Sequence, residues 1–565
     1  MGIPFGELAK SLMEEYLSWD PSFATQVGWH SYDRVLRDPS VKAAEHIAER
    51  CRELSGELRR IPSKTLTEEE LIDRDLAVYI LRLKLFETEE LKLFEREALA
   101  CTEVGYSLFF LFARDHPSFE ERLESIIYRL EAIPGFLRDS RNVLRSPYRL
   151  WNEAALETGR EIPGLLRNIE ALAEAKGTDS NTKKRLERAI KVSIMSIEEH
   201  NKWLAEKVIP SSDSKHAIDP DEYDRYFEIK GYGLTSDQAL EVGETYLLLA
   251  KKKTIGIAAQ IVPSGNPEEA IDMMKSDHAE TFEAALKEYR ESVKAAREFV
   301  MKNDILTIPE NEKLLVLETP MFMRTMLPFA AQFEPGKFDG SRTGMFMVTP
   351  DNANPELLRE HSRAGIVNTT VHEGYPGHHI QGICANTNPS PIRILTASPD
   401  FGEGWGLYSE DMMISLGYND NPLGRLTTNC DLIFRIVRLI VEIKLAKGEM
   451  TIDEATETLK HECAMEAQAS WKEARSCAMS PTYFAAYFLG KLALMQLRED
   501  VELAMGPRFS LKFFHDALLY AGCLPMEFMR RSVALKLKQQ YGITLDPQKE
   551  TLYEYAMKKA RGEGA

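Results

Sequence analysis

Apolar residues recur at intervals of three and four along the first two hundred residues of the chain. The series is clear at Leu123, Ile126, Ile127 and Leu130, with charged residues between them. This spacing places the apolar side chains on one side of a helix, so each segment is predicted to be a helix that buries one stripe. Most of the remainder, especially after Thr451, shows the same periodicity.

Capping-box sequences mark where several of these helices begin. In a capping box, a Ser or Thr precedes the helix by one position and a Glu stands three residues further on, so that each satisfies a backbone N–H of the first turn. The pairs are Thr67 with Glu70, Ser118 with Glu121, and Thr451 with Glu454. The chain is therefore predicted to be mainly α-helical.

A different pattern occupies the stretch from Lys313 to Thr349. Two short apolar runs, Leu314–Leu317 and Met345–Val348, have Pro or Gly nearby. Short apolar runs between turn-forming residues are typical of strands. They predict a small β-sheet within the helical chain, just before a helix that is expected to begin near Ala364.

The segment Val371–His379 is the most informative for chemistry. Its sequence is Val-His-Glu-Gly-Tyr-Pro-Gly-His-His. In an H-E-x-x-H helix, two histidines one turn apart hold Zn²⁺ and the glutamate acts as a general base. Here His378 follows His372 by six residues, and on a regular helix its ring would point roughly 120° away.

The glycines and the proline within this segment remove that obstacle, because they permit a local bulge. If Tyr375–Gly377 loops outward, His378 takes the position of the second ligand, beside His372, and Glu373 faces the open side of the metal. We therefore predict that His372 and His378 are ligands and that Glu373 is the general base. His379 then supports the site or faces the substrate, with the ligand role as its alternative.

A second helix is predicted over Phe401–Glu410 and supplies the third ligand. Glu403 and Glu410 are seven residues apart and so share a helix face. Two His and one Glu form a known ligand set for a catalytic zinc that keeps one position open. We predict Glu403 as the third ligand and Glu410 as the acceptor of the free N–H of a liganding imidazole. A solvated helix face is the alternative for Glu410.

The sequences His372–Gln381 and Glu403–Glu410 together resemble the signature of the family catalogued as domain of unknown function 885. Its members are predicted zinc metallopeptidases, similar to gluzincins and to Taq-type carboxypeptidases. The resemblance extends over most of the chain and is sharp over residues 342–490. The family pattern His-Glu-x-x-Pro-Gly-His-His matches both His378 and His379, so it does not choose between them.

The resemblance also suggests residues on the substrate side. Pro481–Gly490 is similar to the family segment Pro-Gly-Gln-Ala-x-x-Tyr-x-x-Gly, and the match includes Tyr487. Tyr487 is thereby the candidate for polarising the scissile carbonyl or holding the oxyanion, with a buried core tyrosine as the alternative. The family's Asp-Thr-Gly-x-His stretch has no counterpart near Ala446, and His461 is a candidate replacement for its histidine.

Two further features bear on substrate binding. Arg435 and Arg438 are candidates for gripping a C-terminal carboxylate through paired hydrogen bonds, and structural ion pairs are their alternative. Gluzincin-like sites commonly bind an extended peptide along an edge strand beside the metal helix. Met345–Val348 is the candidate for that strand, with a buried core strand as the alternative.

Composition and charge limit the remaining possibilities. A chain of 565 residues with 44% hydrophobic residues is expected to form more than one packed unit. A turn-rich polar stretch, Ile209–His216, separates a predicted helical subdomain at residues 1–210 from a gluzincin-like catalytic subdomain at residues 222–565. The net charge of −18 argues against nucleic-acid and anionic-membrane partners.

No uncharged apolar run reaches the ~18 residues that cross a bilayer, and no secretory signal is visible at the N-terminus. The seven cysteines are scattered, which predicts reduced thiols in the cytoplasm.

The sequence as a whole predicts a zinc-dependent peptidase for short peptides, of the carboxypeptidase or oligopeptidase type. Zn²⁺ is expected to acidify a water molecule, from which Glu373 takes the proton and passes it to the leaving amine. The alternatives are a metal-dependent hydrolase of other amides or esters and a catalytically silent, peptide-binding helical protein. The oligomeric state is left open.

Overall fold

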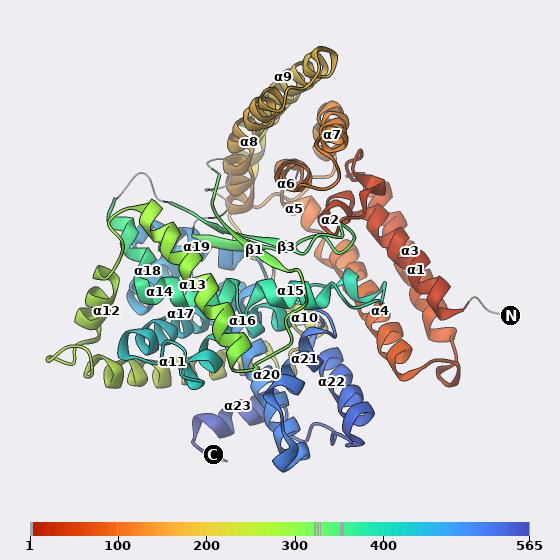
Figure 1. The fold of residues 1–565 in the computed structure, drawn as a ribbon. Coiled ribbons are helices and arrows are strands. Elements are labelled where there is room, and N and C mark those ends of the chain that lie inside the picture. The colour runs from red at the N-terminus through yellow and green to blue at the C-terminus, as the bar shows by residue number, and fades with distance from the viewer. Residues whose placement is uncertain are drawn as a thin grey trace.

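The computed structural model describes residues 4–563 except 99, 321–323, 325–326, 328 and 351–354, and it leaves the side chains of 355–357 undescribed. The protein is mainly helical and contains one small sheet, as predicted (Figure 1). The first helices are α1 (Phe5–Trp19), α2 (Pro21–Gln26), α3 (Val41–Arg60), α4 (Glu68–Phe86), α5 (Leu93–Arg96), α6 (Ala100–Ala113), α7 (Phe119–Ser140), α8 (Arg149–Ala175) and α9 (Ser180–Trp203).

The second group of helices follows the polar stretch near residue 210, and the sheet lies within it. These helices are α10 (Pro220–Lys230), α11 (Ser236–Ala258), α12 (Pro267–Ser276), α13 (Phe282–Lys302), α14 (Arg363–Glu373), α15 (His378–Ala385), α16 (Pro399–Ser415), α17 (Pro422–Ala446), α18 (Ile452–Cys463), α19 (Ala467–Met479), α20 (Tyr483–Met505), α21 (Leu511–Leu519), α22 (Met526–Tyr541) and α23 (Leu552–Ala560).

The predicted helix starts agree with the structure. Capping boxes are present at the beginnings of α4, α7 and α18, where the sequence places them. The helix expected from about Ala364 begins one residue earlier, at Arg363, where the Ser362 side chain accepts the N–H of Gly365. Local capping chemistry therefore specifies these boundaries without help from tertiary contacts.

The sheet has three strands in the order β1-β3-β2. Both predicted strands are confirmed, as β1 (Lys313–Glu318) and β3 (Thr343–Val348), and they pair in parallel. A third strand, β2 (Ala330–Phe333), pairs antiparallel to β3 and was not predicted. The candidate edge strand, Met345–Val348, therefore lies in β3 at the centre of the sheet, and the edge-strand interpretation of that segment is wrong.

The sheet lies between two helical layers, because successive side chains of a strand point to opposite faces. Phe346 and Val348 join a core that includes residues of α13, α14 and α16. Met347, between them, packs with residues of α6, α7, α8 and α9. In Figure 1 the sheet crosses the centre of the molecule, with α8 and α9 projecting above it.

The two predicted subdomains share packing. The core that contains Phe346 also takes apolar side chains from α1, α3 and α4 and from α21 and α22. Residues before 210 and after 222 thus contribute to one cluster. The division at these positions stays a prediction, because a shared core does not define where either part ends.

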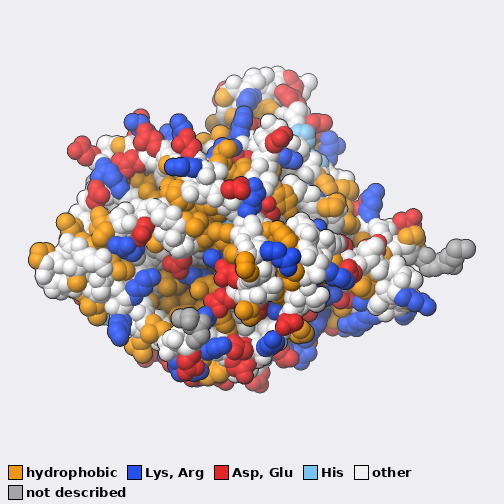
Figure 2. Space-filling view, turned by 60° about the horizontal axis from the view of Figure 1, so that its bottom comes forward, with side chains coloured by type: hydrophobic (Ala, Val, Ile, Leu, Met, Phe, Trp, Pro, Cys, Tyr) orange, Lys and Arg blue, Asp and Glu red, His pale blue; other side chains and the backbone are white. Residues whose placement is uncertain are grey.

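The surface mixes charges of both signs. On the face seen in Figure 2, Lys and Arg side chains alternate with Asp and Glu side chains around hydrophobic areas. Such interspersion gives this face no extended field of one sign. Among the described helices, none combines the length and the apolar character that crossing a membrane requires.

Glycines allow α16 and α20 to cross in close contact. A Cβ on Gly404 of α16 would lie 2.6 Å from the carbonyl carbon of Gly490 of α20, and a Cβ on Gly490 would lie 1.8 Å from the carbonyl oxygen of Asp400. Two backbones therefore touch where side chains usually intervene. This contact fixes the position of α16, which carries Glu403.

We predict that Gly404→Ala lowers the free energy of unfolding by about 1–3 kcal/mol, because the added methyl group forces the two helices apart. Gly402→Ala, two residues away on the same helix, is the matched control. Its Cβ would meet only the Cys523 sulfur at 3.7 Å, so helix propensity makes it neutral or slightly stabilising. Guanidinium unfolding followed by circular dichroism compares the two, and equal unfolding midpoints would contradict this packing.

Candidate metal centre

A tight turn separates α14 from α15 and sets the positions of the histidines. The N–H of Gly377 donates to the carbonyl of Val371 at 3.0 Å. A Cβ on Gly377 would lie 1.8 Å from the carbonyl oxygen of His372, so only glycine fits there. The chain folds back on the end of α14, and α15 begins directly at His378.

This turn corrects the expected outward bulge. The helix does not continue past Glu373, and Tyr375 points inward with only 2% of its surface exposed. Its peptide bond to Pro376 is cis. Two separate helices, rather than one kinked helix, therefore present the two imidazoles.

The ligand set predicted from sequence comes together in space. The Nε2 atoms of His372 and His378 lie 3.6 and 3.3 Å from Oε2 of Glu403. Among the described residues, these three form the one group of His, Cys, Asp or Glu ligand atoms all within 4.8 Å of one another. The site thus joins the C-terminus of α14, the N-terminus of α15 and the first turns of α16.

These separations fit a tetrahedral zinc ion. Each ligand atom of such a site lies about 2.0–2.2 Å from the metal, so two ligand atoms lie about 3.3–3.5 Å apart. The two measured imidazole-to-carboxylate distances, 3.6 and 3.3 Å, agree with that geometry. Two imidazoles and one carboxylate also leave a fourth position for water or substrate.

Glu410 fixes the orientation of the His372 imidazole from the side opposite to Glu403. Its Nδ1 lies 2.7 Å from Oε1 of Glu410, which leaves Nε2 directed at Glu403. The ring also lies flat on α16, because a Cβ on Gly406 would come within 2.6 Å of it. Glu410 thus contacts the imidazole of His372 as sequence reasoning expected, and its role behind a metal ligand stays a prediction.

Glu410 is itself fixed by polar groups that sequence reasoning missed. The Asn368 side chain donates to Oε2 of Glu410 at 2.9 Å and to Asp431 at 2.6 Å. Arg435 lies 3.2 Å from Asp431 and 4.0 Å from Glu410. Arg435 therefore takes part in a buried ion-pair network behind the ligands. No local sequence pattern predicts such a network, because its members come from α14, α16 and α17.

The charges of these groups shift one another's pKa values. Burial lowers the pKa of His372, but hydrogen bonds to Glu403 and Glu410 outweigh it and raise the pKa to about 10. Burial raises the pKa of Glu403, but the two imidazoles outweigh it and hold the pKa well below its usual range. Protonated imidazoles would balance the carboxylates here, and a metal ion bound to these atoms would displace the protons.

Glu373 lies beside the ligands without a partner of its own. It is the last residue of α14 and is half-buried. Its charge contributes to raising the pKa of both His372 and His378, so it is near both rings. Among the described residues none forms a hydrogen bond or ion pair with its carboxylate.

His379 does not join the ligand group. It is completely buried, and its Nε2 lies 2.8 Å from Oε2 of Glu312, just before β1. The carboxyl group of Glu312 also accepts from Tyr375 and Arg297. Burial raises the pKa of Glu312, but these hydrogen bonds outweigh it and lower the pKa to about 2. His379 thus ties α15 to the sheet, whereas His378 faces Glu403.

Two tyrosines of α20 reach the site. Tyr483, which sequence reasoning passed over, donates its hydroxyl to Oε1 of Glu403 at 2.7 Å. Tyr487 lies one turn further along, and burial and the charge of Glu403 raise its pKa, so its phenol stays protonated at neutral pH. The sequence did contain a signal for Tyr483: it stands four residues before Tyr487, so both lie on one face of the helix.

The start of α20 is anchored by Glu442 of α17. Its carboxylate accepts the backbone N–H groups of Thr482, Phe484 and Ala485 at 2.9, 2.6 and 3.2 Å. A carboxylate at a helix N-terminus satisfies free N–H groups and complements the helix dipole. This anchor positions both tyrosines, and it lies in the segment where the histidine of the resembled family pattern is absent.

Arg438 and His461, the remaining candidate residues, lie outside the ligand group. The guanidinium of Arg438 stacks on Tyr487 at 4.2 Å and on Phe434 at 4.4 Å, and it donates to Glu473 at 3.3 Å. It therefore lies next to the candidate oxyanion donor. His461 has a side chain that is 73% exposed and pairs with Glu457 on the outer face of α18, so it does not supply a buried histidine.

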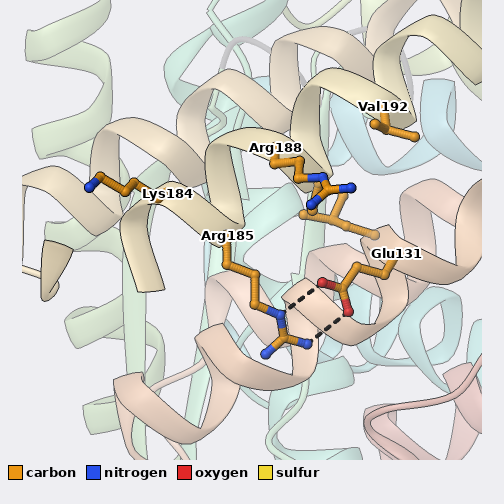
Figure 3. A pocket seen from close by; sticks show the side chains of 7 residues that line it. Glu131, Lys184, Arg185, Arg188 and Val192 are labelled. Atoms are coloured by element: carbon orange, nitrogen blue, oxygen red, sulfur yellow. Dashed lines mark hydrogen bonds and ion pairs between the residues drawn. The ribbon is translucent and has the colours of Figure 1, made fainter. Parts of the chain in front are cut away.

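A separate hollow of about 690 Å³ lies between α7 and α9 (Figure 3). Arg185 forms paired hydrogen bonds with Glu131 across it. The lining residues are Leu130, Glu131, Lys184, Arg185, Arg188, Ala189 and Val192. None of these side chains is a histidine or cysteine, and one carboxylate alone does not make a metal site.

Comparison with known proteins identifies the family. Residues 21–533 match the family described as "Bacterial protein of unknown function (DUF885)". Because the match covers most of the chain, the protein belongs to this family. Among curated proteins none matches the chain.

Two solved structures share the fold over nearly the whole length. One, from Shewanella oneidensis, is titled a "putative lipoprotein of unknown function"; it is 21% identical and has a TM-score of 0.78, with 94% of this chain and 99% of that chain covered. The other, a "putative lipoprotein" from Colwellia psychrerythraea, is 18% identical and has a TM-score of 0.81, with 95% and 99% covered.

A carboxypeptidase from Pyrococcus furiosus aligns with a TM-score of only 0.34 at 12% identity. That value is too low to carry an argument about this chain.

The choice between the adjacent histidines is testable by metal content. We predict that His378→Ala removes a ligand and abolishes stoichiometric zinc binding at micromolar concentration. His379→Ala keeps the zinc but lowers the unfolding temperature, because Glu312 loses a buried charged hydrogen bond worth about 1.5–3 kcal/mol. Inductively coupled plasma analysis and thermal unfolding measure the two effects, and the opposite pattern would assign the ligand role to His379.

Proposed function

We propose that this protein is a zinc-dependent peptidase that hydrolyses short peptides, with His372, His378 and Glu403 as the zinc ligands. The observation that carries the proposal is the meeting of these three ligand atoms at separations suited to tetrahedral zinc. Glu373 stands next to the first ligand, and none of the described residues forms a hydrogen bond or ion pair with its carboxylate. This combination of a three-ligand metal site and an adjacent free carboxylate is typical of peptide-hydrolysing zinc enzymes.

The proposed chemistry divides between the metal and the chain. A zinc ion in this site would act as a Lewis acid that acidifies water and polarises a carbonyl group. Glu373 takes the proton of the attacking water and returns it to the leaving amine, acting first as a base and then as an acid. Its half-buried position at the end of α14 keeps it near the reacting atoms yet accessible to the substrate.

Tyr487 is the proposed donor to the oxyanion. Its raised pKa keeps the hydroxyl proton in place at neutral pH, as a hydrogen-bond donor requires. The cation of Arg438 lies over its ring at 4.2 Å and adds positive potential where negative charge develops. Tyr483 is occupied by Glu403, so its proposed role is to orient that ligand.

Short peptides are the proposed substrates because the N-terminal helices lie close to the site. The ring of Phe109 in α6 lies 5.2 Å from that of Phe333 in β2, and β2 packs against α15, which begins with His378. Helices so close to the metal site would hinder the approach of a folded protein more than that of a short peptide.

Two other functions are compatible with some of the same observations. Hydrolysis of another amide or an ester would use the same ligands and the same base. A catalytically silent peptide-binding protein would need neither the metal ligands nor the base. The carboxylate of Glu373, which none of the described residues pairs with, favours an enzyme over that alternative. A C-terminal grip is disfavoured for both arginines, because Arg435 is paired with Asp431 and Arg438 with Glu473.

Location and partners stay predictions. All seven cysteines are free thiols, which supports a reducing compartment such as the cytoplasm. Peptides are the proposed partners, and nucleic acids and membranes are not.

The role of Glu373 has a direct test. We predict that Glu373→Gln keeps zinc at the wild-type stoichiometry and lowers kcat by about 10²–10⁴-fold, because the amide cannot accept the proton. Glu45→Gln, an exposed carboxylate of α3, is the matched control and keeps wild-type activity. Cleavage of a peptide library by each zinc-loaded variant, analysed by mass spectrometry, measures the turnover of the two variants. Wild-type turnover by the Glu373→Gln protein would exclude this base.

A further inference from the structure

Glu334 lies at the end of the edge strand that is nearest to the proposed metal site. It directly follows β2, whose described pairing is with β3 alone. The other side of β2 therefore has backbone groups that are free to pair with an extended peptide. β2 also packs against α15, the helix that begins with His378.

The carboxylate of Glu334 rests on the metal-facing side of α15. A Cβ on Gly382 would lie 2.1 Å from Oε2 of Glu334, so the carboxylate covers the bare backbone of this glycine. Gly382 is four residues after His378 and thus occupies the same face, one turn further along. The charges of Arg114 and His378 both act on the carboxyl group of Glu334. The carboxylate is therefore a close neighbour of the proposed ligand.

No described group neutralises this carboxylate through a hydrogen bond or an ion pair. Its residue is exposed to solvent, so a cationic group of a bound molecule can reach the carboxylate.

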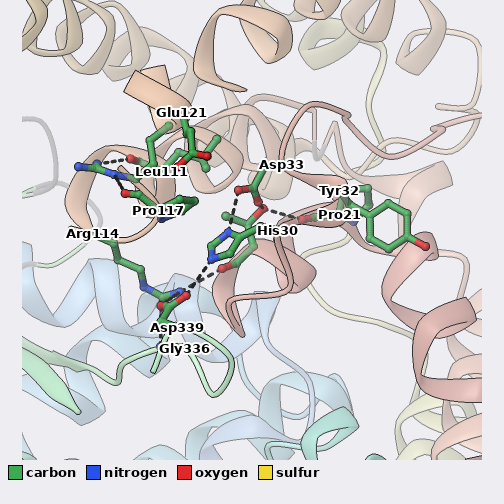
Figure 4. A network of polar contacts seen from close by, with 12 residues as sticks. Pro21, His30, Tyr32, Asp33, Leu111, Arg114, Pro117, Glu121, Gly336 and Asp339 are labelled. Carbon is green, nitrogen blue, oxygen red and sulfur yellow. Dashed lines mark hydrogen bonds and ion pairs between the residues drawn. The ribbon is translucent and has the colours of Figure 1, made fainter. Parts of the chain in front are cut away.

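The nearby cations are occupied elsewhere. Arg114 donates to the backbone carbonyls of Thr25 and of Glu334 itself, at 3.0 and 3.1 Å. Its guanidinium also faces Asp339, which in turn accepts from His30 (Figure 4). Lys337 donates to the carbonyl of Asn386 at 3.2 Å. These contacts hold the loop after β2 in place and leave the side chain of Glu334 unpaired.

Three buried glutamates of this region differ from Glu334 in this respect. Glu312, Glu410 and Glu442 each accept two or more hydrogen bonds from neighbouring elements. Those carboxylates connect parts of the fold. Within the described part of the chain, Glu334 makes no such connection through its side chain, so holding the fold together does not account for it.

We infer that Glu334 is a specificity determinant that binds a cationic group of the substrate, an ammonium or a guanidinium, beside His378. The inference rests on the proposed function in taking the ligand to be a peptide. Pairing along β2 gives affinity for any extended peptide backbone, and Glu334 adds preference for positive charge. The cation is either the N-terminal amine of a short peptide or a Lys or Arg side chain, and both have the same chemistry.

Binding measurements separate these two sources without any need for turnover. The test uses zinc-loaded Glu373→Gln protein and the tetrapeptide Ala-Ala-Lys-Ala, its N-acetylated form, its norleucine form and the doubly neutral form. Isothermal titration calorimetry gives the Kd of each. We expect one of the two neutralisations to raise the Kd at least tenfold, and the one that does so identifies the bound cation.

The same titrations are then made on protein that carries Glu334→Gln in addition to Glu373→Gln. We expect the preference for the charged peptide to fall to within twofold, while Glu45→Gln in the same background keeps it. Glu334→Ala serves as a second variant, and thermal unfolding and zinc content verify that each protein is folded.

Three results would overturn the inference: equal Kd values for all four peptides, an unchanged preference after Glu334→Gln and Glu334→Ala, or no binding of any of them. Failure of the proposed function looks different. In that case the peptides bind with the expected preference, but zinc-loaded wild-type protein cleaves none of them.

Discussion

The short turn between α14 and α15 is the constraint on which the rest of the site depends. His372 ends one helix and His378 begins the next, and Gly377 is the residue that lets the chain pass within contact of the His372 carbonyl. On one continuous helix the two rings would diverge. The turn replaces the ordinary spacing of an H-E-x-x-H helix and keeps Glu373 at the helix end, next to the first ring.

Everything else in the centre of the protein stabilises that arrangement. Glu410 orients His372 from behind, and Asn368 holds Glu410. Gly406 lets the ring lie on α16, and Gly404 lets α16 touch α20. The ligands are therefore fixed by groups from several helices. Such preorganisation lets a site bind a metal ion without rearranging.

The substrate side is built on different elements. Glu442 anchors the start of α20 and so positions Tyr483 and Tyr487. The edge strand β2 and Glu334 approach from the opposite end, over α15. In the proposed function, the metal site, the hydroxyl of Tyr487 and the carboxylate of Glu334 would all contact a bound peptide.

Sequence reasoning anticipated the parts of this structure that local chemistry specifies. Capping boxes predicted the starts of three helices, and the apolar run at Leu314 predicted a strand. Sequence reasoning also expected His372, His378 and Glu403 to lie together, as they do, but through an outward bulge that the structure replaces by a turn between two helices. The helix starts and the strand depend on residues close together in the chain, so their patterns are visible without tertiary information.

Other features depend on contacts between distant segments. β2 is only four residues long and its side chains are half-buried, so it lacks the alternation that marks a strand. The pair of His379 with Glu312 spans 67 positions, and Tyr483 reaches a carboxylate 80 positions away. Nothing in the local sequence distinguishes such residues from ordinary buried ones.

The central claim is that two imidazoles and one carboxylate share a zinc ion. X-ray absorption spectroscopy at the zinc edge, on protein loaded with one equivalent of zinc, measures this coordination directly. The account predicts a four-coordinate ion with two imidazole nitrogens and a carboxylate oxygen at about 2.0–2.2 Å. A six-coordinate oxygen shell without imidazole, a sulfur ligand, or failure to retain zinc would contradict it.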